Sequence, residues 1–371
     1  MVLAPAGSTP TPCSCWLFAW PGCCNDSALA LHLHRAGVSN VQPAMNIAII
    51  GTGIAAATLV YRLRQSCPGF SISVFEKSRG VGGRMSTRRG DDGIYDHGAP
   101  FFTARSKSFQ QLLKTFQSSG AVAEWKPRVM TLSKDKKPYT RDWFEPHYVA
   151  TPNMNQLCKA LLVDQNIHFK QTINRISGEP GQWTIHSAEG DEFGIFDWVI
   201  STAPAEQTQA IFSTATATTT EVPVVPYQPS FSLMVSCAED YDPAFDAARV
   251  NDSSIDWLFF GHRKPGRSQR PSLVVHATGE YSAKHFDDDR DIVKKELLAE
   301  LTALTGIEPG LETDGTHLHR WKYAKVLEPY GEPFWQSDLK CLAACGDWCL
   351  GNEVEHAYTS ADALAKTHSV G

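Results

Sequence analysis

Long apolar runs, a surplus of basic residues and a secretory signal are all missing from this sequence of 371 residues. No uninterrupted apolar stretch is long enough to cross a bilayer, so no membrane-spanning helix is predicted. The formal net charge of −6 offers no positive surface for nucleic acid or for an anionic membrane. These absences favour a soluble protein.

Ten cysteines are present, but they form no pattern typical of a metal site or a disulfide scaffold. Four of them crowd the first 24 residues without a His or Cys cluster at zinc-ligand spacing. The series Cys341, Cys345 and Cys349 has helical spacing, but Gly346-Asp347 interrupts it. We therefore expect no metal, thiols that are buried as packing residues, and a reducing compartment, the cytoplasm.

The N-terminal segment 1–44 contains one acid, Asp26, and one arginine, Arg35. It has no periodic apolar pattern and lacks the basic n-region of a secretory signal. We expect a disordered leader, with Met45 as an alternative start of translation. A transit peptide stays open as an alternative.

The first strong motif is Gly51-Thr52-Gly53-Ile54-Ala55-Ala56, between a predicted buried strand over 46–50 and a predicted helix near 54–65. Gly51 permits a tight turn, and Gly53 lets the backbone approach a pyrophosphate. The first amides of the helix, at Ile54 and Ala55, face that anion at the positive end of the helix dipole.

A second predicted strand, 71–75, ends in Glu76, which Lys77 follows. An acid at this place binds the hydroxyls of an adenosine ribose and suits FAD or NAD better than NADP.

The segment Gly80-Val81-Gly82-Gly83-Arg84-Met85 then adds a second glycine turn and an arginine that can neutralise a diphosphate. Together with Tyr95-Asp96-His97-Gly98-Ala99-Pro100-Phe101-Phe102, this segment resembles the flavin amine oxidase superfamily. The resemblance implies FAD, held in part by Gly83, Arg84, Met85, His97, Gly98 and Ala99. No cysteine is well placed to form a covalent link to the flavin, so we expect the FAD to be non-covalent.

The C-terminal run Leu342-Ala343-Ala344-Cys345-Gly346-Asp347 also resembles that superfamily. By this resemblance Asp347 binds the ribityl chain of FAD, and the helix that begins near Glu355, His356 and Ala357 points its N-terminus at the flavin. Glycine is expected at the positions of His356 and Ala361, so a flavin-binding sensor or scaffold stays open beside an enzyme.

Over residues 45–371 the chain resembles the renalase-like branch, through 271–278 and 319–324. Alternation in the predicted strand 272–278 puts Val274, His276 and Thr278 on one face, opposite core residues. In 316–323, alternation places His317, His319, Trp321 and Tyr323 together. We predict that His276 holds the substrate and that Trp321 flanks its ring.

The predicted fold class is α/β, with a Rossmann-type FAD-binding domain and a smaller α+β substrate domain. The FAD-binding domain is predicted over 45–100, 150–205 and 325–371, and the substrate domain over 101–149 and 206–324. A surface helix is expected over 291–305.

The resemblance implies an oxidase of isomeric dihydronicotinamides that produces NAD(P) and passes electrons to O2, giving H2O2. A flavin-dependent amine oxidase is the alternative. A non-flavin NAD dehydrogenase is a further one.

Overall fold

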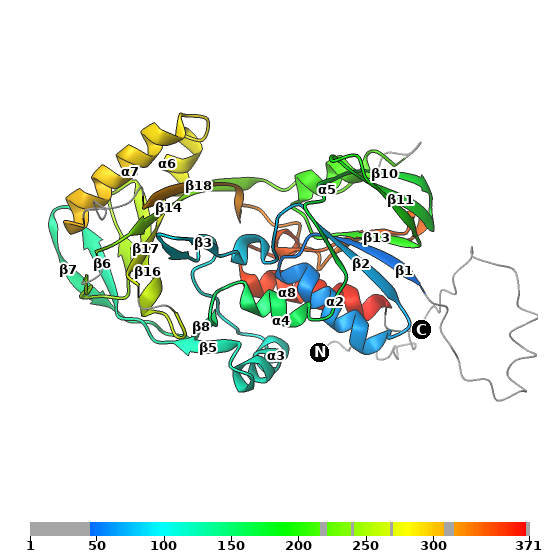
Figure 1. The fold of residues 1–371 in the computed structure, drawn as a ribbon, viewed down its shortest axis with the longest axis horizontal. Helices are drawn as coiled ribbons and strands as arrows, with labels where there is room; N and C mark the ends of the chain where they lie inside the picture. The colour runs from blue at the N-terminus through cyan, green and yellow to red at the C-terminus, as the bar shows by residue number, and fades with distance from the viewer. Residues whose placement is uncertain (1–44, 216–220, 239–240, 268–269, 308–314, 369–371) are drawn as a thin grey trace, which may run out of the picture. The chain divides into compact units, whose positions relative to one another are not determined.

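The computed structural model describes residues 45–215, 221–238, 241–267, 270–307 and 315–368 (Figure 1). The predicted leader, 1–44, lies outside the described residues. None of the helices in the described ranges is long and apolar enough to span a bilayer.

A six-stranded sheet in the order β19-β20-β13-β1-β2-β9 forms the first half of the described fold (Figure 1). Its strands are parallel except for β19, which pairs antiparallel with β20. The strands are β1 (Asn46–Ile50), β2 (Ser71–Glu76), β9 (Ile167–Phe169), β13 (Trp198–Ser201), β19 (Trp335–Ser337) and β20 (Leu342–Ala344).

Both faces of this sheet are covered. Helices α2 (Ile54–Ser66), α4 (Gln156–Leu161) and α8 (Val354–His368) pack together on one face, where Leu59, Leu63 and Leu364 are fully buried. On the other face lie α5 (Ala205–Phe212) and a three-stranded antiparallel sheet. The strands of that smaller sheet are β10 (Ile173–Glu179), β11 (Gln182–Ser187) and β12 (Glu192–Phe196).

The turn after β1 depends on glycine. Gly51 has φ +106°, and a Cβ there would collide with the hydroxyl oxygen of Thr202. This turn delivers the chain directly into α2, whose N-cap residue Gly53 supplies no side chain to cap the helix. The first amides of α2 are therefore left for a ligand at the carboxyl end of the sheet.

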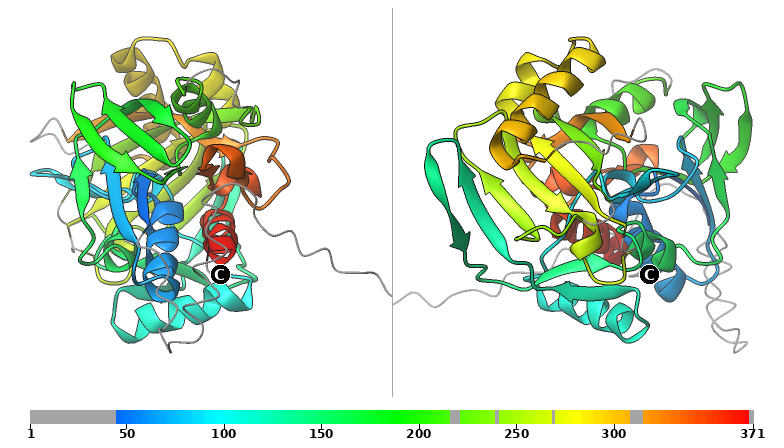
Figure 2. Two further views of the ribbon diagram at one scale, coloured as in Figure 1. Left: turned by 90° about the vertical axis from the view of Figure 1, so that its right-hand side faces the viewer. Right: turned by 60° about the vertical axis from the view of Figure 1, so that its left-hand side comes forward.

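A seven-stranded sheet in the order β18-β14-β17-β16-β15-β6-β7 forms the second half (Figure 2). All its pairs are antiparallel except β15 with β6. Its strands are β6 (Val129–Ser133), β7 (Lys136–Arg141), β14 (Tyr227–Ser236), β15 (Ala247–Val250), β16 (Ile255–Phe260), β17 (Ser272–Ala277) and β18 (Thr316–Val326).

One face of the seven-stranded sheet packs against α7 (Arg290–Thr305), next to α6 (Gly279–Lys284). Leu273, Val275 and Ala277 of β17 belong to this core, together with Val293 and Leu297 of α7. The predicted core face of this strand and the predicted helix over 291–305 are therefore both found. An aspartate N-cap, Asp289, begins α7, and Gly306, with φ +70°, ends it.

The opposite face carries a row of seven residues that lie side by side across all seven strands. Directly paired residues of neighbouring strands point to the same side of a sheet. We call this set the cavity row: Tyr139, Thr131, Arg249, Trp257, His276, Ser232 and His319, in strand order from β7 to β18.

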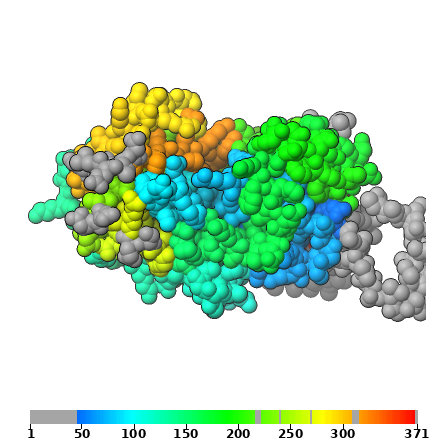
Figure 3. All heavy atoms as spheres, in the orientation of Figure 1, coloured from blue at the N-terminus to red at the C-terminus, as the bar shows by residue number. Residues whose placement is uncertain are grey.

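The remaining elements lie outside the two large sheets and the helices that cover them. They are α3 (Lys107–Ser118), the hairpin of β3 (Arg88–Gly90) with β4 (Gly93–Tyr95), the pair β5 (Val122–Trp125) with β8 (His147–Ala150), and the 3-10 turns η1 (Gly83–Met85), η2 (Gly261–Arg263), η3 (Asp338–Lys340) and η4 (Asp347–Cys349). In the space-filling view, the light-blue chain near η1 and β3 lies between the green and the yellow regions (Figure 3).

The predicted α/β class with a Rossmann-type half is found. Residues 44–371 cluster as one compact unit, so the predicted boundaries between an FAD-binding and a substrate domain stay a prediction. The strand expected over 316–323 extends to Val326 and thus reaches from the seven-stranded sheet toward the six-stranded one.

Candidate functional site

A cavity of about 1980 Å³ is lined by residues of both sheets. This is about twice the upper end of the ~300–1,000 Å³ typical of ligand pockets. Its wall includes the turn after β1, the end of β2, η1, the start of α8, and residues of β14, β17 and β18. The volume is sufficient for a dinucleotide together with a second ligand.

At the six-stranded sheet the cavity is lined by Gly51, Gly53, Ile54 and Ala55. Gly83, with φ +53°, lies so close that a Cβ there would stand 3.2 Å from the Cα of Gly53. Two glycine segments therefore meet at the N-terminus of α2. No side chain separates a ligand from the backbone amides at this point.

Glu76 lines the same end of the cavity and is only 7% exposed. Its two oxygens accept hydrogen bonds from the hydroxyl of Thr52 (2.5 Å) and the amide of Ser78 (2.8 Å). These bonds hold the carboxylate in place at the end of β2, and Lys77 lines the wall beside it. The arrangement suits a ribose with both hydroxyls free.

Arg84 and Asp347 meet in the middle of the cavity wall. The guanidinium donates to both carboxylate oxygens, with 2.7 Å from Nη1 to Oδ2, and also to the carbonyl oxygens of Tyr323 and Ala324. Burial opposes the charge of Arg84, but Asp347 outweighs it and raises the pKa of the arginine. The pair ties η1 to η4 and to β18.

The segment after β4 depends on a glycine. A Cβ at Gly98 would collide with the carbonyl oxygen of Arg84, which also accepts the amide of Ala99 at 2.7 Å. His97, Gly98 and Ala99 therefore run directly against η1, and all three line the cavity together with Met85.

At the seven-stranded sheet the wall is aromatic. The indole nitrogen of Trp321 donates to the carbonyl of His97 at 2.9 Å, and the two rings stack with centroids 5.3 Å apart. The ring of His319 lies 4.3 Å from that of Trp321. Trp321 is therefore fixed by its own hydrogen bond, and its ring forms part of an aromatic wall.

His276 lies in the cavity row next to Ser232 and lines the cavity. Its Nε2 atom is buried and has no hydrogen-bond partner within the described chain. Burial, followed by the charges of Lys325 and Lys264, lowers the pKa of His276 to about 3. A neutral imidazole with an unused nitrogen is thus available to a ligand.

Comparison with known families decides what kind of cavity this is. A model of the NAD(P)-binding Rossmann-like domain matches residues 49–116, and a model of the flavin containing amine oxidoreductases matches residues 128–366, more than half of the chain. The chain belongs to the flavin containing amine oxidoreductases.

Solved structures of this fold agree with that membership. A putative protoporphyrinogen oxidase from Exiguobacterium sp. 255-15 superimposes with a TM-score of 0.69 at 12% identity, covering 90% of this chain and 100% of that one. A putrescine oxidase with bound putrescine gives 0.61 at 11% identity, covering 88% and 99%. At these identities the likeness concerns the fold.

A curated relative is the tRNA 5-methylaminomethyl-2-thiouridine biosynthesis bifunctional protein MnmC of Magnetococcus marinus. It is 25% identical over 205 residues, which cover 44% of this chain and 30% of that protein. The matched part thus spans less than a third of the relative's length.

The cavity fits the FAD of an amine oxidoreductase. The glycine cradle at α2, the fixed carboxylate of Glu76 and the Arg84–Asp347 pair supply a diphosphate site, a ribose site and a polar middle section. The protein is an FAD-dependent oxidoreductase, and these residues would hold its cofactor.

Two residues predicted to bind the cofactor do not line the cavity. The carboxylate of Glu355 accepts the backbone amides of Arg105 (2.7 Å) and Ser106 (2.6 Å) at the start of α3. His356 turns back, and its Nδ1 accepts the amide of Glu353 at 3.2 Å. Within that helix Ala357, together with Val354, does line the cavity.

Sequence reasoning missed a second aromatic wall, formed by Phe101, Trp143 and His147. The ring centroids of Trp143 and His147 are 3.7 Å apart, and Trp143 stacks at 6.0 Å on Trp257 of the cavity row. The density of aromatic residues over 143–148 was the available signal, but that segment has no strand-like alternation to show which side chains face a ligand.

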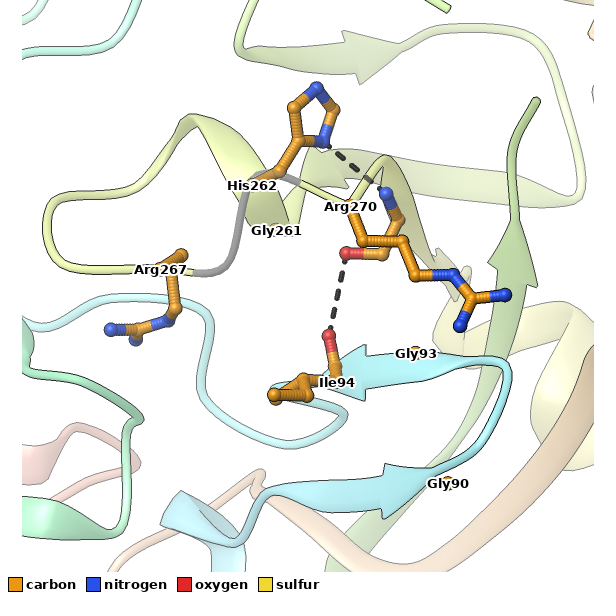
Figure 4. Close-up of a pocket in the computed structure, with 8 residues that line it drawn as sticks. Gly90, Gly93, Ile94, Gly261, His262, Arg267 and Arg270 are labelled. Atoms are coloured by element: carbon orange, nitrogen blue, oxygen red, sulfur yellow. Dashed lines mark hydrogen bonds between the residues drawn. The ribbon is translucent and has the colours of Figure 1, made fainter. Parts of the chain in front are cut away.

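A smaller cavity of about 210 Å³ lies between β4, η2 and the start of β17 (Figure 4). Ser272 lines this cavity. Its hydroxyl donates to the carbonyl oxygen of Ile94, and its amide donates to Nδ1 of His262. The side chains of Arg267 and Arg270 point away from one another in this view, so they do not converge on one ligand (Figure 4).

Proposed function

We propose that this oxidoreductase is a renalase-like oxidase of isomeric dihydronicotinamides, which it converts to NAD(P) with O2 as the acceptor. The observation that carries the proposal is the unpartnered Nε2 of His276 in a cavity that the aromatic rings of His319 and Trp321 also line. A planar ring with a carboxamide can stack on that wall and exchange a hydrogen bond with this nitrogen.

In this proposal the chain's own residues bind, orient and exclude water. His276 stays neutral, because its pKa is about 3, and so it holds the carboxamide without taking a proton. Trp321, fixed by its bond to His97, limits the tilt of the substrate ring. Positioning of this kind accounts for much of the rate when hydride transfer needs little acid–base help.

Bound FAD would accept the hydride and pass the electrons to O2, giving H2O2. No cysteine of the described chain lines the cavity, which supports non-covalent attachment of the cofactor. Acid precipitation should therefore release the yellow colour into the supernatant.

The carboxylates of the wall argue against amine substrates. Within the described residues it contains four, and each is engaged: Glu76 with Thr52 and Ser78, Asp347 with Arg84, and Glu145 and Glu353 with Arg105. An alkylammonium substrate would find no carboxylate that is not already engaged.

The test is an anaerobic titration of the purified protein, followed through its visible flavin spectrum. Rapid bleaching by 2- or 6-dihydronicotinamide isomers, without bleaching by putrescine or benzylamine, is the expected result. Bleaching by amines alone would assign the protein to the amine oxidases. A flavin that no donor reduces would contradict the proposal and favour a sensor or scaffold.

A further inference from the structure

The charges around His276 point to a substrate that carries an anionic oxygen group, and we propose that Lys325 binds it. The group is a carboxylate or a phosphate, which share this chemistry. The inference deepens the proposed function in that it takes the wall at His276 as the substrate site, but it does not depend on a nicotinamide ring.

The first observation is the positive charge of the cavity wall. Ten lysine and arginine residues line it against four carboxylates, although the protein as a whole has a net charge of −6. The positive charge of the molecule is thus concentrated where the ligands bind. A diphosphate at α2 accounts for part of this excess but lies at the opposite end from β17.

The second observation is a cluster of two cations that share one carboxylate. Asp256 lies at an irregularity in the pairing of β16 with β17, and bulges of this kind re-aim a side chain. One oxygen of Asp256 pairs with Arg249, and the other lies 3.6 Å from the Nζ of Lys325. Since Asp256 can neutralise only one of them, the cluster keeps a positive charge.

The third observation is a second cluster of the same composition, around Asp96. Asp96 is buried with Lys264 at 3.3 Å and Arg267 at 2.7 Å, again two cations for one carboxylate. Its remaining oxygen accepts the hydroxyl of Thr87 and the amide of Met154. Both clusters act on His276, because their lysines, Lys325 and Lys264, are the charges that lower its pKa most.

The two clusters differ in whether a ligand in the cavity can reach their lysine. The side chain of Lys264 is 1% exposed and does not line the cavity. Lys325 lines the cavity, its side chain is half-exposed, and its one acidic contact is long and shared. A substrate whose ring lies against His276 can therefore bring its anionic group to Lys325.

The test uses planar probes of one size and different charge: benzoate, benzamide, benzylamine and phenyl phosphate. Their dissociation constants for the FAD-loaded protein are measured by equilibrium dialysis and by perturbation of the flavin spectrum, without turnover. We expect benzoate or phenyl phosphate to bind at least ~10-fold more tightly than benzamide, as expected for one charge-assisted contact. Which of the two binds more tightly distinguishes a carboxylate from a phosphate.

The variant Lys325→Gln should remove that advantage and leave the affinity for benzamide unchanged. The matched control is Lys294→Gln on α7, at the opposite face of the same sheet, which should change neither. Equal binding of benzoate, phenyl phosphate and benzamide by the unaltered protein would overturn the inference. Tighter binding of benzylamine would also overturn it, because the site would then prefer a cation. In either case, bleaching by dihydronicotinamides still tests the proposed function independently.

Discussion

His276 is held neutral by two effects that act in the same direction. Burial and the neighbouring cations both disfavour the imidazolium, and His319 in the same row has its pKa lowered to about 4, mainly by burial. Histidines in water would change charge near pH 6.5 and alter ligand binding there. These two keep one protonation state throughout the neutral range.

This predicts how stability responds to acid. Below pH 6.5 the unfolded chain protonates His276 whereas the native state does not, so the unfolded state binds more protons. The free energy of unfolding should therefore fall as the pH drops from about 6.5 toward 3, by up to ~1.4 kcal/mol per pH unit for one such group. His276→Asn should flatten the slope of melting temperature against pH. An unchanged slope would contradict the assignment.

Arg84 contributes geometry as well as charge. Arg84→Lys keeps the cation but loses the planar fork that meets both oxygens of Asp347. We expect at least ~10-fold weaker FAD binding, measured as the flavin content of the dialysed protein. Arg79→Lys is the matched control, because Arg79 lines the same cavity and has an exposed side chain. Equal flavin loss in both variants would contradict a specific role for the planar fork of Arg84.

Among the helices and strands, the sequence predicted best those in which a buried apolar run adjoins a glycine turn. The strands predicted over 46–50 and 71–75 and the helix near 54–65 are found within one residue, because each joins a buried apolar run to a glycine turn. Strand β7 has six exposed residues and no alternation, so nothing in its sequence marks it as a strand.

Contacts between distant parts of the chain explain what the sequence could not show at the site. The alternation of side chains along a strand correctly placed His276 and Trp321 on faces that line the cavity. Glu355, in contrast, was predicted to bind the cofactor, but its partners are amides 249 and 250 residues earlier in the chain. No local pattern encodes such a pairing.

Glu355 therefore has a testable role at the start of α3. Glu355→Gln should lower the free energy of unfolding by about 2 kcal/mol, because hydrogen bonds to a charged acceptor are worth ~1.5–3 kcal/mol each and the amide keeps part of them. Flavin content should stay unchanged. Chemical denaturation measures the first and the visible spectrum the second. Loss of flavin without loss of stability would restore the cofactor-binding role.

For the whole molecule, the cavity is lined by residues of both large sheets. A ligand that touches both sheets stabilises the native state by an amount set only by its concentration relative to its dissociation constant. FAD at 100 times that constant should raise the free energy of unfolding of the apoprotein by ~2.7 kcal/mol. Calorimetry of apoprotein and reconstituted protein measures this, and a flavin-independent melting temperature would contradict it.

The cavity row has a consequence for how this protein can evolve. Its members stand on one face of the seven-stranded sheet, while the core with α7 uses the other face. A substitution at Ser232 or His319, which line the cavity, therefore changes the surface that meets a substrate without removing a side chain from that core. The shape and polarity of the substrate site can therefore change at these two positions while the packing of α7 on the sheet is kept, although a change at Ser232 also removes the hydrogen bond from its hydroxyl to the carbonyl of His97.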